Sequence, residues 1–287
     1  MKKSILFIFT ACFLVTTSCS DFLDEEHKTK YSSEYVFGTP EGLKLAVNAL
    51  YALQRYYAND TENATIFALE RGTDLAVTNG GTGNFYGIYD PNYLKPSASQ
   101  VGFMWRTMYQ IIGKANEIIA AAEDLEDTPS LRATVSEAKC FRAQSYFLLY
   151  RTFDRIWLNI QPTTAENVND PRDFHAASEK EVFDLIYEDL EYAITNLDWV
   201  SDEAGRFTQA AARHMKAKAA LWLKDWDTTL EQVEEIEKSG HFDLIALNEV
   251  FNAGDLNHKE ALMVQQWSKN PGGNLSNATP KGNYEPG

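Results

Sequence analysis

A cysteine close to the N-terminus is the first residue whose surroundings indicate chemistry. Cys19 follows two lysines, a short apolar run at residues 5–15 and three small residues at 16–18. The apolar run is too short to span a bilayer as a mature helix, so it predicts a secretory signal. Small residues before a cysteine favour lipid modification of the Cys19 thiol, which would then begin the mature chain. Ordinary signal cleavage beside an unrelated cysteine is the alternative, since Thr16 stands where a leucine is usual.

A turn-rich stretch at residues 79–93 carries a second candidate group, which suits ligand binding. Its asparagines and glycines predict a flexible turn, and its aromatic rings alternate with amide and carboxylate side chains. Flat rings with polar neighbours fit a sugar, whose C–H face stacks while its hydroxyls form hydrogen bonds. The same rings could instead anchor the stretch onto helices. The candidates are Asn84, Phe85, Tyr86, Tyr89 and Tyr93, together with Trp267 from a stretch at 260–267 that could form a strand.

Catalytic patterns are largely missing from the sequence. The five histidines are scattered, and none shows metal-ligand spacing such as H-E-x-x-H. The nucleophile pattern G-x-S-x-G does not occur, and the glycines near residue 80 lack the G-K-[ST] of a phosphate loop. Among 41 acidic residues, a carboxylate pair carries no information without geometry. We therefore expect a protein that is not an enzyme, with no metal and no cofactor.

Composition narrows the class of partner. The formal net charge of −15 argues against nucleic acid, which requires basic surfaces to meet phosphate. A hydrophobic share of 44% over 287 residues indicates a globular chain of one or two domains. If the signal is removed and Cys19 is acylated, Cys140 remains alone and no intrachain disulfide can form. Cys140 lies on an apolar helical face, where we expect a small buried hydrophobe.

The elements that must position these residues are helices, organised around residues 136–153. Cys140, Ala143, Phe147 and Tyr150 advance at helical spacing and share one face. A neighbouring face is formed by Ala138, Phe141 and Leu148. A helix with two apolar faces is typical of a solenoid, in which each helical hairpin touches a neighbour on either side. We therefore expect Phe147 and Leu148 to be buried, with Thr128 as N-cap and Pro129 at the first helical position.

Further helical stretches surround this one and complete an all-α prediction. They begin at Pro40 after Thr39, at Trp105, at a capping box from Ser178 to Glu181, at Ala210, and after an N-cap at Asp227. The last of them should end at Ser239-Gly240 in a left-handed cap. Asn116 is a polar residue on an apolar helix, so we expect it to hydrogen-bond a neighbouring loop. The predicted fold is a tetratricopeptide-like helical solenoid with long irregular loops.

Three of these stretches resemble one known family. E-A-K-C-F-R-A-Q-S-Y-F-L-L at 137–149, W-R-T-M-Y-Q-I-I-G-K-A-N at 105–116 and C-S-D-F-L-D at 19–24 are similar to motifs of the SusD/RagB family. Its members are lipid-anchored nutrient-binding proteins of the outer membrane. One segment departs from the family pattern: where an "FGDVPL"-type turn is usual, Asp154 replaces the glycine and Trp157 the proline.

The resemblance implies a function and a domain layout. It implies a cell-surface, outer-membrane lipoprotein that binds an oligosaccharide and delivers it to a SusC-like TonB-dependent transporter. Alternatives are a peptide or another nutrient on the same scaffold, or a tetratricopeptide-like protein-interaction module. The layout expected is a signal peptide at 1–18, a tether at 19–38, a SusD-like N-terminal helical domain at 39–250 and the start of a truncated C-terminal portion at 251–287.

Overall fold

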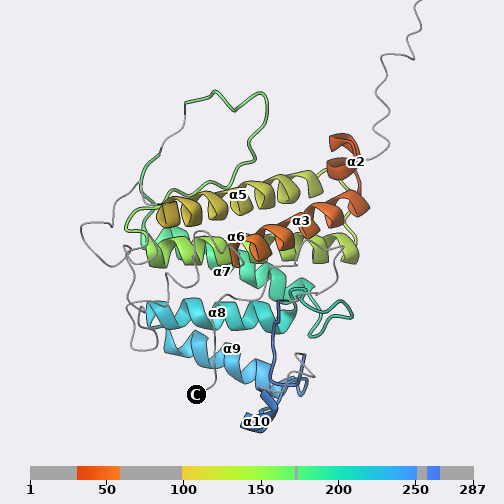
Figure 1. Cartoon of the computed structure of the whole chain (residues 1–287), viewed down its shortest axis with the longest axis vertical. Coiled ribbons are helices and arrows are strands. Elements are labelled where there is room, and N and C mark those ends of the chain that lie inside the picture. The colour runs from red at the N-terminus through yellow and green to blue at the C-terminus, as the bar shows by residue number, and fades with distance from the viewer. Residues whose placement is uncertain (1–30, 59–98, 172–173, 251–256, 266–287) are drawn as a thin grey trace, which may run out of the picture.

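The protein is built from helices that pack side by side in the order of the chain. The computed structural model describes residues 31–58, 99–171, 174–250 and 257–265. Within them the helices are α2 (Ser33–Gly38), α3 (Pro40–Ala58), α5 (Ser99–Ala122), α6 (Pro129–Thr152), α7 (Glu179–Asn196), α8 (Gln209–Leu223), α9 (Trp226–Lys238) and α10 (Leu247–Val250). Each long helix contacts the next, from α3 through to α9 (Figure 1). These described residues contain no strand, which confirms the all-α prediction.

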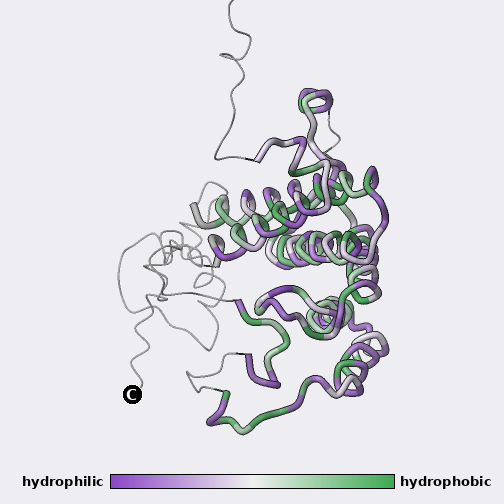
Figure 2. Tube along the Cα trace, turned by 90° about the vertical axis from the view of Figure 1, so that its right-hand side faces the viewer, coloured by the Kyte–Doolittle hydropathy of each residue, from purple (hydrophilic) through white to green (hydrophobic). Residues whose placement is uncertain are grey.

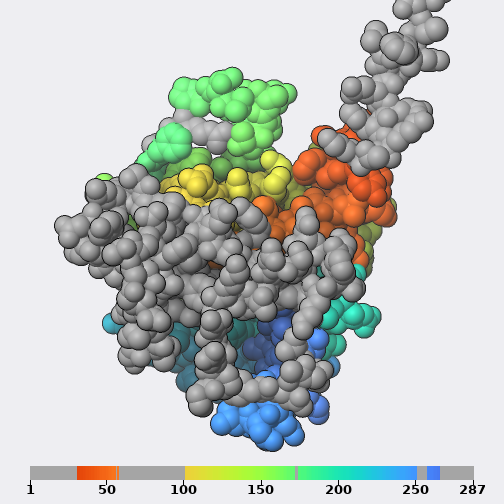
Figure 3. All heavy atoms as spheres, viewed as in Figure 1, coloured from red at the N-terminus to blue at the C-terminus, as the bar shows by residue number. Residues whose placement is uncertain are grey.

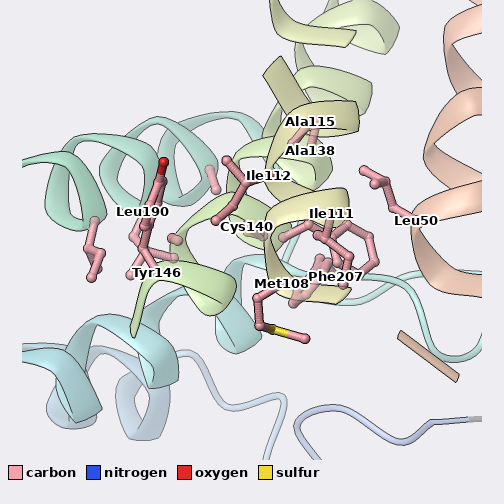
Figure 4. Close-up of a cluster of buried hydrophobic side chains, with 14 of the residues drawn as sticks. Leu50, Met108, Ile111, Ile112, Ala115, Ala138, Cys140, Tyr146, Leu190 and Phe207 are labelled. Carbon is pink, nitrogen blue, oxygen red and sulfur yellow. The ribbon is translucent and has the colours of Figure 1, made fainter. Parts of the chain in front are cut away.

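Helix α6 lies at the centre and is enclosed on more than one side. Ten consecutive residues, Thr134 to Ala143, are buried. The helix packs against α5, α7 and α3. Its side chains meet those of the neighbouring helices in one hydrophobic cluster, in which Cys140 lies among residues of α3, α5 and α7 (Figure 4). The prediction of a central helix with two buried faces, and of a buried Cys140, is confirmed.

The register of the last two turns of α6 differs from the prediction. Phe147 and Leu148 are only partly buried, whereas Tyr146 and Leu149 are fully enclosed. The Phe147 ring lies at the margin of the core, where it meets the ring of Phe183 edge-on. The positions of α5 and α7 determine which residues of α6 are buried. These positions cannot be read from the spacing of residues within α6.

Local capping signals were read correctly at most helix ends. The Thr128 side chain accepts a hydrogen bond from the N–H of Leu131, with Pro129 at the helix start. The capping box of Ser178 and Glu181 is present on α7. Capping side chains of this kind satisfy backbone donors that a helix leaves free at its first turn. Gly240 has a φ of +69°, as predicted for a left-handed cap.

The start of α9 was predicted two residues too late. Its N-cap is Asp225, whose side chain accepts from the N–H of Thr228, and Asp227 lies inside the first turn. Helix α8 ends at Leu223, and its C-cap Lys224 takes the left-handed conformation with a φ of 61°. That residue reverses the chain at once, so α8 and α9 are joined by a very short turn.

One further expectation was wrong, since residues 260–265 form no strand. Trp222 lies at helical spacing from the buried Ala212 and Ala219 but is 49% exposed, and Trp226, Leu230 and Val233 of α9 are exposed as well. No described element covers that end of the helical stack. Apolar and polar segments otherwise alternate along each helix, as expected where one face is buried (Figure 2).

Candidate functional site

An aromatic surface on the connection between α6 and α7 is the candidate site among the described residues. The residues predicted from sequence, Cys19, Asn84, Phe85, Tyr86, Tyr89, Tyr93 and Trp267, lie outside the described part of the chain. The connection between α6 and α7 instead brings Trp157 and Phe174 together, beside Tyr109 of α5. It projects beyond α5 on the outside of the helical stack (Figures 1 and 3).

The rings form a continuous row from the helices to the solvent. Trp157 and Phe174 have ring centroids 4.8 Å apart, and Tyr109 stacks on Trp157 at 6.4 Å. Trp105 continues the row inward, 4.8 Å from Tyr109. Phe174 is 70% exposed and Trp157 is partly buried. We name Trp157 and Phe174, with Tyr109 behind them, the aromatic platform. Rings held at the surface in this way offer flat apolar faces to a ligand.

Tyr109 fixes the backbone of Trp157 in two directions. Its hydroxyl donates to the Trp157 carbonyl at 2.8 Å and accepts from the Trp157 N–H at 2.9 Å. Burial raises the pKa of Tyr109, and its hydrogen bond to Trp157 opposes this only in part. The phenol therefore keeps its proton and remains a donor. This pair of hydrogen bonds holds the backbone of Trp157 against α5.

The next residues of the loop are fixed in the same manner by Tyr146 and Asn116. The Tyr146 hydroxyl donates to the Asn159 carbonyl at 2.9 Å and accepts from the Asn159 N–H at 2.7 Å. The Asn116 amide donates to the same carbonyl at 2.7 Å. The prediction that Asn116 bonds a neighbouring loop is confirmed.

A buried ion network orients the Asn116 amide. Asp189 of α7 is fully buried and accepts from Arg142 at 2.7 Å through both Nε and Nη2, and from Lys139 at 2.8 Å. Burial acts to lower the pKa of Arg142, but its hydrogen bonds and attraction to Asp189 raise the pKa overall, so the guanidinium stays charged. Arg142 Nη1 donates to the Asn116 oxygen at 2.8 Å, which turns the amide nitrogen toward the loop. Side chains of α5, α6 and α7 thus hold the platform loop together.

A second polar cluster holds the connection between α7 and α8. Tyr51 donates to the Glu137 carboxylate and accepts from the Phe207 N–H at 2.7 Å. Arg206 pairs with Glu137 at 3.0 Å. Burial raises the pKa of Glu137, although the hydrogen bond from Tyr51 and the charge of Arg206 oppose the shift. Because every polar group in this cluster has a partner, we interpret it as a structural contact that fixes the connection between α7 and α8.

Sequence reasoning missed the platform, although one signal was present. Trp157 stands where the family motif has proline, and an aromatic residue at a turn is a hint of surface exposure. Phe174 carried no signal, because nothing near it in sequence indicates that it meets Trp157. Asn116 stood in a recognised motif, but its link to Asp189 through Arg142 could not be read from spacing.

Two absences hold for the described residues only. No group of three or more histidine, cysteine, aspartate or glutamate side chains there could hold a metal ion. No helix in the same part of the chain has both the length and the apolar character needed to cross a membrane.

Helices that stack in chain order define a helical protein of tetratricopeptide-like fold, which here carries exposed rings on one connection. A family model described as SusD-like, starch-binding and associating with the outer membrane, matches residues 21–221. The chain belongs to this SusD-like family.

Known relatives share the fold and are longer. A SusD-like protein of Bacteroides ovatus is 25% identical over 93% of this chain and 50% of its own length. The solved structure of a SusD-like protein from Bacteroides fragilis is 20% identical, with a TM-score of 0.65 over 84% of this chain and 47% of that one. A structure solved with a xylogluco-oligosaccharide is 22% identical, with a TM-score of 0.63 over 79% of this chain and 46% of that one. The chain spans about half the length of the curated relatives it matches.

Proposed function

We propose that this protein binds an oligosaccharide at the cell surface and passes it to a SusC-like TonB-dependent transporter, without catalysing a reaction. The observation that carries the proposal is the aromatic platform, with Phe174 70% exposed and Trp157 clamped to α5. Membership of the SusD-like family and the fold shared with a protein crystallised with a xylogluco-oligosaccharide support the same conclusion.

The platform suits weak and reversible sugar binding. A ring that stacks on a sugar face should contribute on the order of 1 kcal/mol, by analogy with aromatic pairs. Several rings then give micromolar to millimolar dissociation constants. Asn84, Phe85, Tyr86, Tyr89 and Tyr93, with Trp267, are proposed to contact the ligand as well. Such affinities suit a protein that must release its ligand to a transporter.

The test is a glycan array followed by calorimetry on the soluble chain from Ser20. Phe174→Ala and Trp157→Ala should each weaken binding of the selected glycan about fivefold, the equivalent of about 1 kcal/mol. Tyr86→Ala and Tyr89→Ala test the contribution of the 79–93 stretch. The matched control is Trp226→Ala, which removes an aromatic ring that is 58% exposed on α9, away from the platform. Unchanged affinity in both platform variants would place the glycan elsewhere.

The lipid anchor is proposed to attach the mature chain to the outer membrane through Cys19. The positive start, the short apolar run and the small residues before Cys19 support it. Cys19→Ala should move the protein out of the membrane fraction and abolish incorporation of labelled fatty acid. A variant that stays in the membrane fraction, beside a wild type that incorporates no label, would refute the anchor.

A protein-interaction function is the second candidate, and one observation favours it. Trp226, Leu230 and Val233 form an exposed apolar stripe on α9, with spacing of four and three residues. Exposed apolar faces of this kind often mark contacts with another polypeptide. The glycan array separates the two candidate functions, because a protein that only binds other proteins would bind none of the glycans on the array.

A further inference from the structure

A small cavity between α3, α5, α6 and α8 lies apart from the aromatic platform. It has a volume of about 170 Å³ and a largely apolar lining. The apolar side chains that line it are Met108, Ile111, Phe147, Leu148 and Met215. A protein cavity of about 150 Å³ lined by apolar side chains can hold a benzene molecule. The space therefore matches one aromatic ring, and it is too small for an oligosaccharide.

One polar group in the lining lacks a partner. Tyr57 lines the cavity, is only 9% exposed, and its buried hydroxyl forms no hydrogen bond. Burial raises the pKa of Tyr57, so the phenol is protonated at neutral pH and can donate. Buried hydroxyl groups in proteins are normally hydrogen-bonded. A ligand with an oxygen acceptor would supply the missing partner.

Two cations of the lining have no acidic partner among the described residues. Arg151 and Lys218 line the same cavity, both are exposed, and neither forms an ion pair within that part of the chain. Arg151 donates from Nε to the Phe147 carbonyl at 3.3 Å, and its guanidinium lies 4.3 Å from the centroid of the Phe147 ring. Tyr57 lines the same cavity as these two cations. In a chain with a formal net charge of −15, two cations beside one apolar cavity, with no acidic partner among the described residues, favour an anion.

We propose that this cavity binds a small aromatic carboxylate. The ring packs on the apolar lining between α5 and α6. The carboxylate accepts a hydrogen bond from Tyr57 and meets the positive charges of Arg151 and Lys218. The remaining polar pair, Gln54 and Gln144, is already joined at 2.9 Å and closes one side of the site. A neutral apolar molecule would fill the space but would leave the Tyr57 hydroxyl without a hydrogen bond and would gain nothing from the two cations.

The test uses 3-phenylpropionate as the probe, with calorimetry at pH 7 on the chain from Ser20. We expect saturable binding with a dissociation constant between about 0.1 and 1 mM, which corresponds to a ligand of this size with one ionic contact. The neutral analogue 3-phenylpropanamide should bind about tenfold more weakly. No saturable binding of the acid, or equal binding of acid and amide, would overturn the proposal.

Variants locate the site and separate it from the platform. Arg151→Gln should weaken binding of the acid about tenfold, and Tyr57→Phe about fivefold. Leu148→Phe should fill the cavity and abolish binding, while circular dichroism shows an intact helical fold. The control is Arg155→Gln, which removes an arginine that is 80% exposed and lies on the platform loop, away from the cavity. Wild-type affinity in the Arg151 and Tyr57 variants would place the probe elsewhere. Glycan binding should be unchanged in all of these variants.

Discussion

The most informative single change is Asp189→Asn, which removes the buried carboxylate that accepts hydrogen bonds from both Arg142 and Lys139. The Asp189 side chain is fully buried, and those of Lys139 and Arg142 are 10% and 6% exposed. Asparagine keeps the shape of the side chain but removes its charge. It also offers an NH₂ donor where the cations require an acceptor. Arg142 would then lose its carboxylate partner in the interior, and Lys139 would keep a 4.0 Å contact with the exposed Glu188.

The expected cost follows from that burial. Breaking a buried pair by removing one partner destabilises proteins by about 3–5 kcal/mol, because the remaining charge is left unpaired. The matched control is Glu234→Gln on α9, which breaks the pair with Lys238. Both of those side chains are more than half exposed, at 56% and 63%. Exposed pairs four residues apart on a helix contribute about 0.3–0.5 kcal/mol. The two variants should therefore differ roughly tenfold in their effect.

The assay is urea unfolding of wild type and both variants at pH 7, followed by circular dichroism. The midpoint should fall strongly for Asp189→Asn and hardly at all for Glu234→Gln, with the slope against denaturant unchanged. A loss in Asp189→Asn within about 1 kcal/mol of the control would refute the reasoning. It would mean that the network is hydrated or that its charges are compensated in another way.

Three further predictions test burial. Leu149→Ala should cost about 2–5 kcal/mol in urea unfolding, and Leu148→Ala clearly less, because only Leu149 is fully enclosed; equal costs would contradict the observed register of α6. The pKa of Glu137 is raised above its ordinary value of 4.5, chiefly by burial, so the folded state holds more protons than the unfolded state above that pH. Ionisation of Glu137 therefore lowers the free energy of unfolding as the pH rises above 4.5. The stability of Glu137→Gln relative to wild type should improve from pH 4 to pH 7. A difference that stays constant or falls over this range would refute the predicted direction. Burial raises the pKa of the Cys140 thiol well above its usual value. A thiol reagent should therefore label Cys140 only after unfolding. Rapid labelling of the native protein would contradict this and show that α6 opens.

The identity of the helices could be predicted because their signals are local. The caps at Thr128 and Ser178, and the apolar spacing within each helix, depend on residues a few positions apart. Such signals act before any tertiary contact forms. The predicted start of α9 was wrong, because lysine as a residue type does not indicate the left-handed conformation that Lys224 adopts.

The helices packed against each helix determine which of its side chains are buried. The spacing within α6 allowed two apolar faces, but the positions of α5 and α7 selected Tyr146 and Leu149 for full burial over Phe147 and Leu148. Trp222 shares helical spacing with the buried Ala212 and Ala219 and is half exposed, since no described element packs over that side of α8. Helical spacing states which residues share a face and carries no information on whether a partner lies opposite.

The sequence by itself determined the all-α class, most helix ends and the family, because each depends on short motifs and on composition. Only the tertiary structure decided the sites among the described residues. Trp157 meets Phe174 across 17 positions of the chain, and Asp189 acts on the loop through Arg142 and Asn116 from three different helices. Tyr57, Arg151 and Lys218 surround one cavity although they come from α3, α6 and α8. These contacts join residues far apart in the chain, so they arise only when the helices stack.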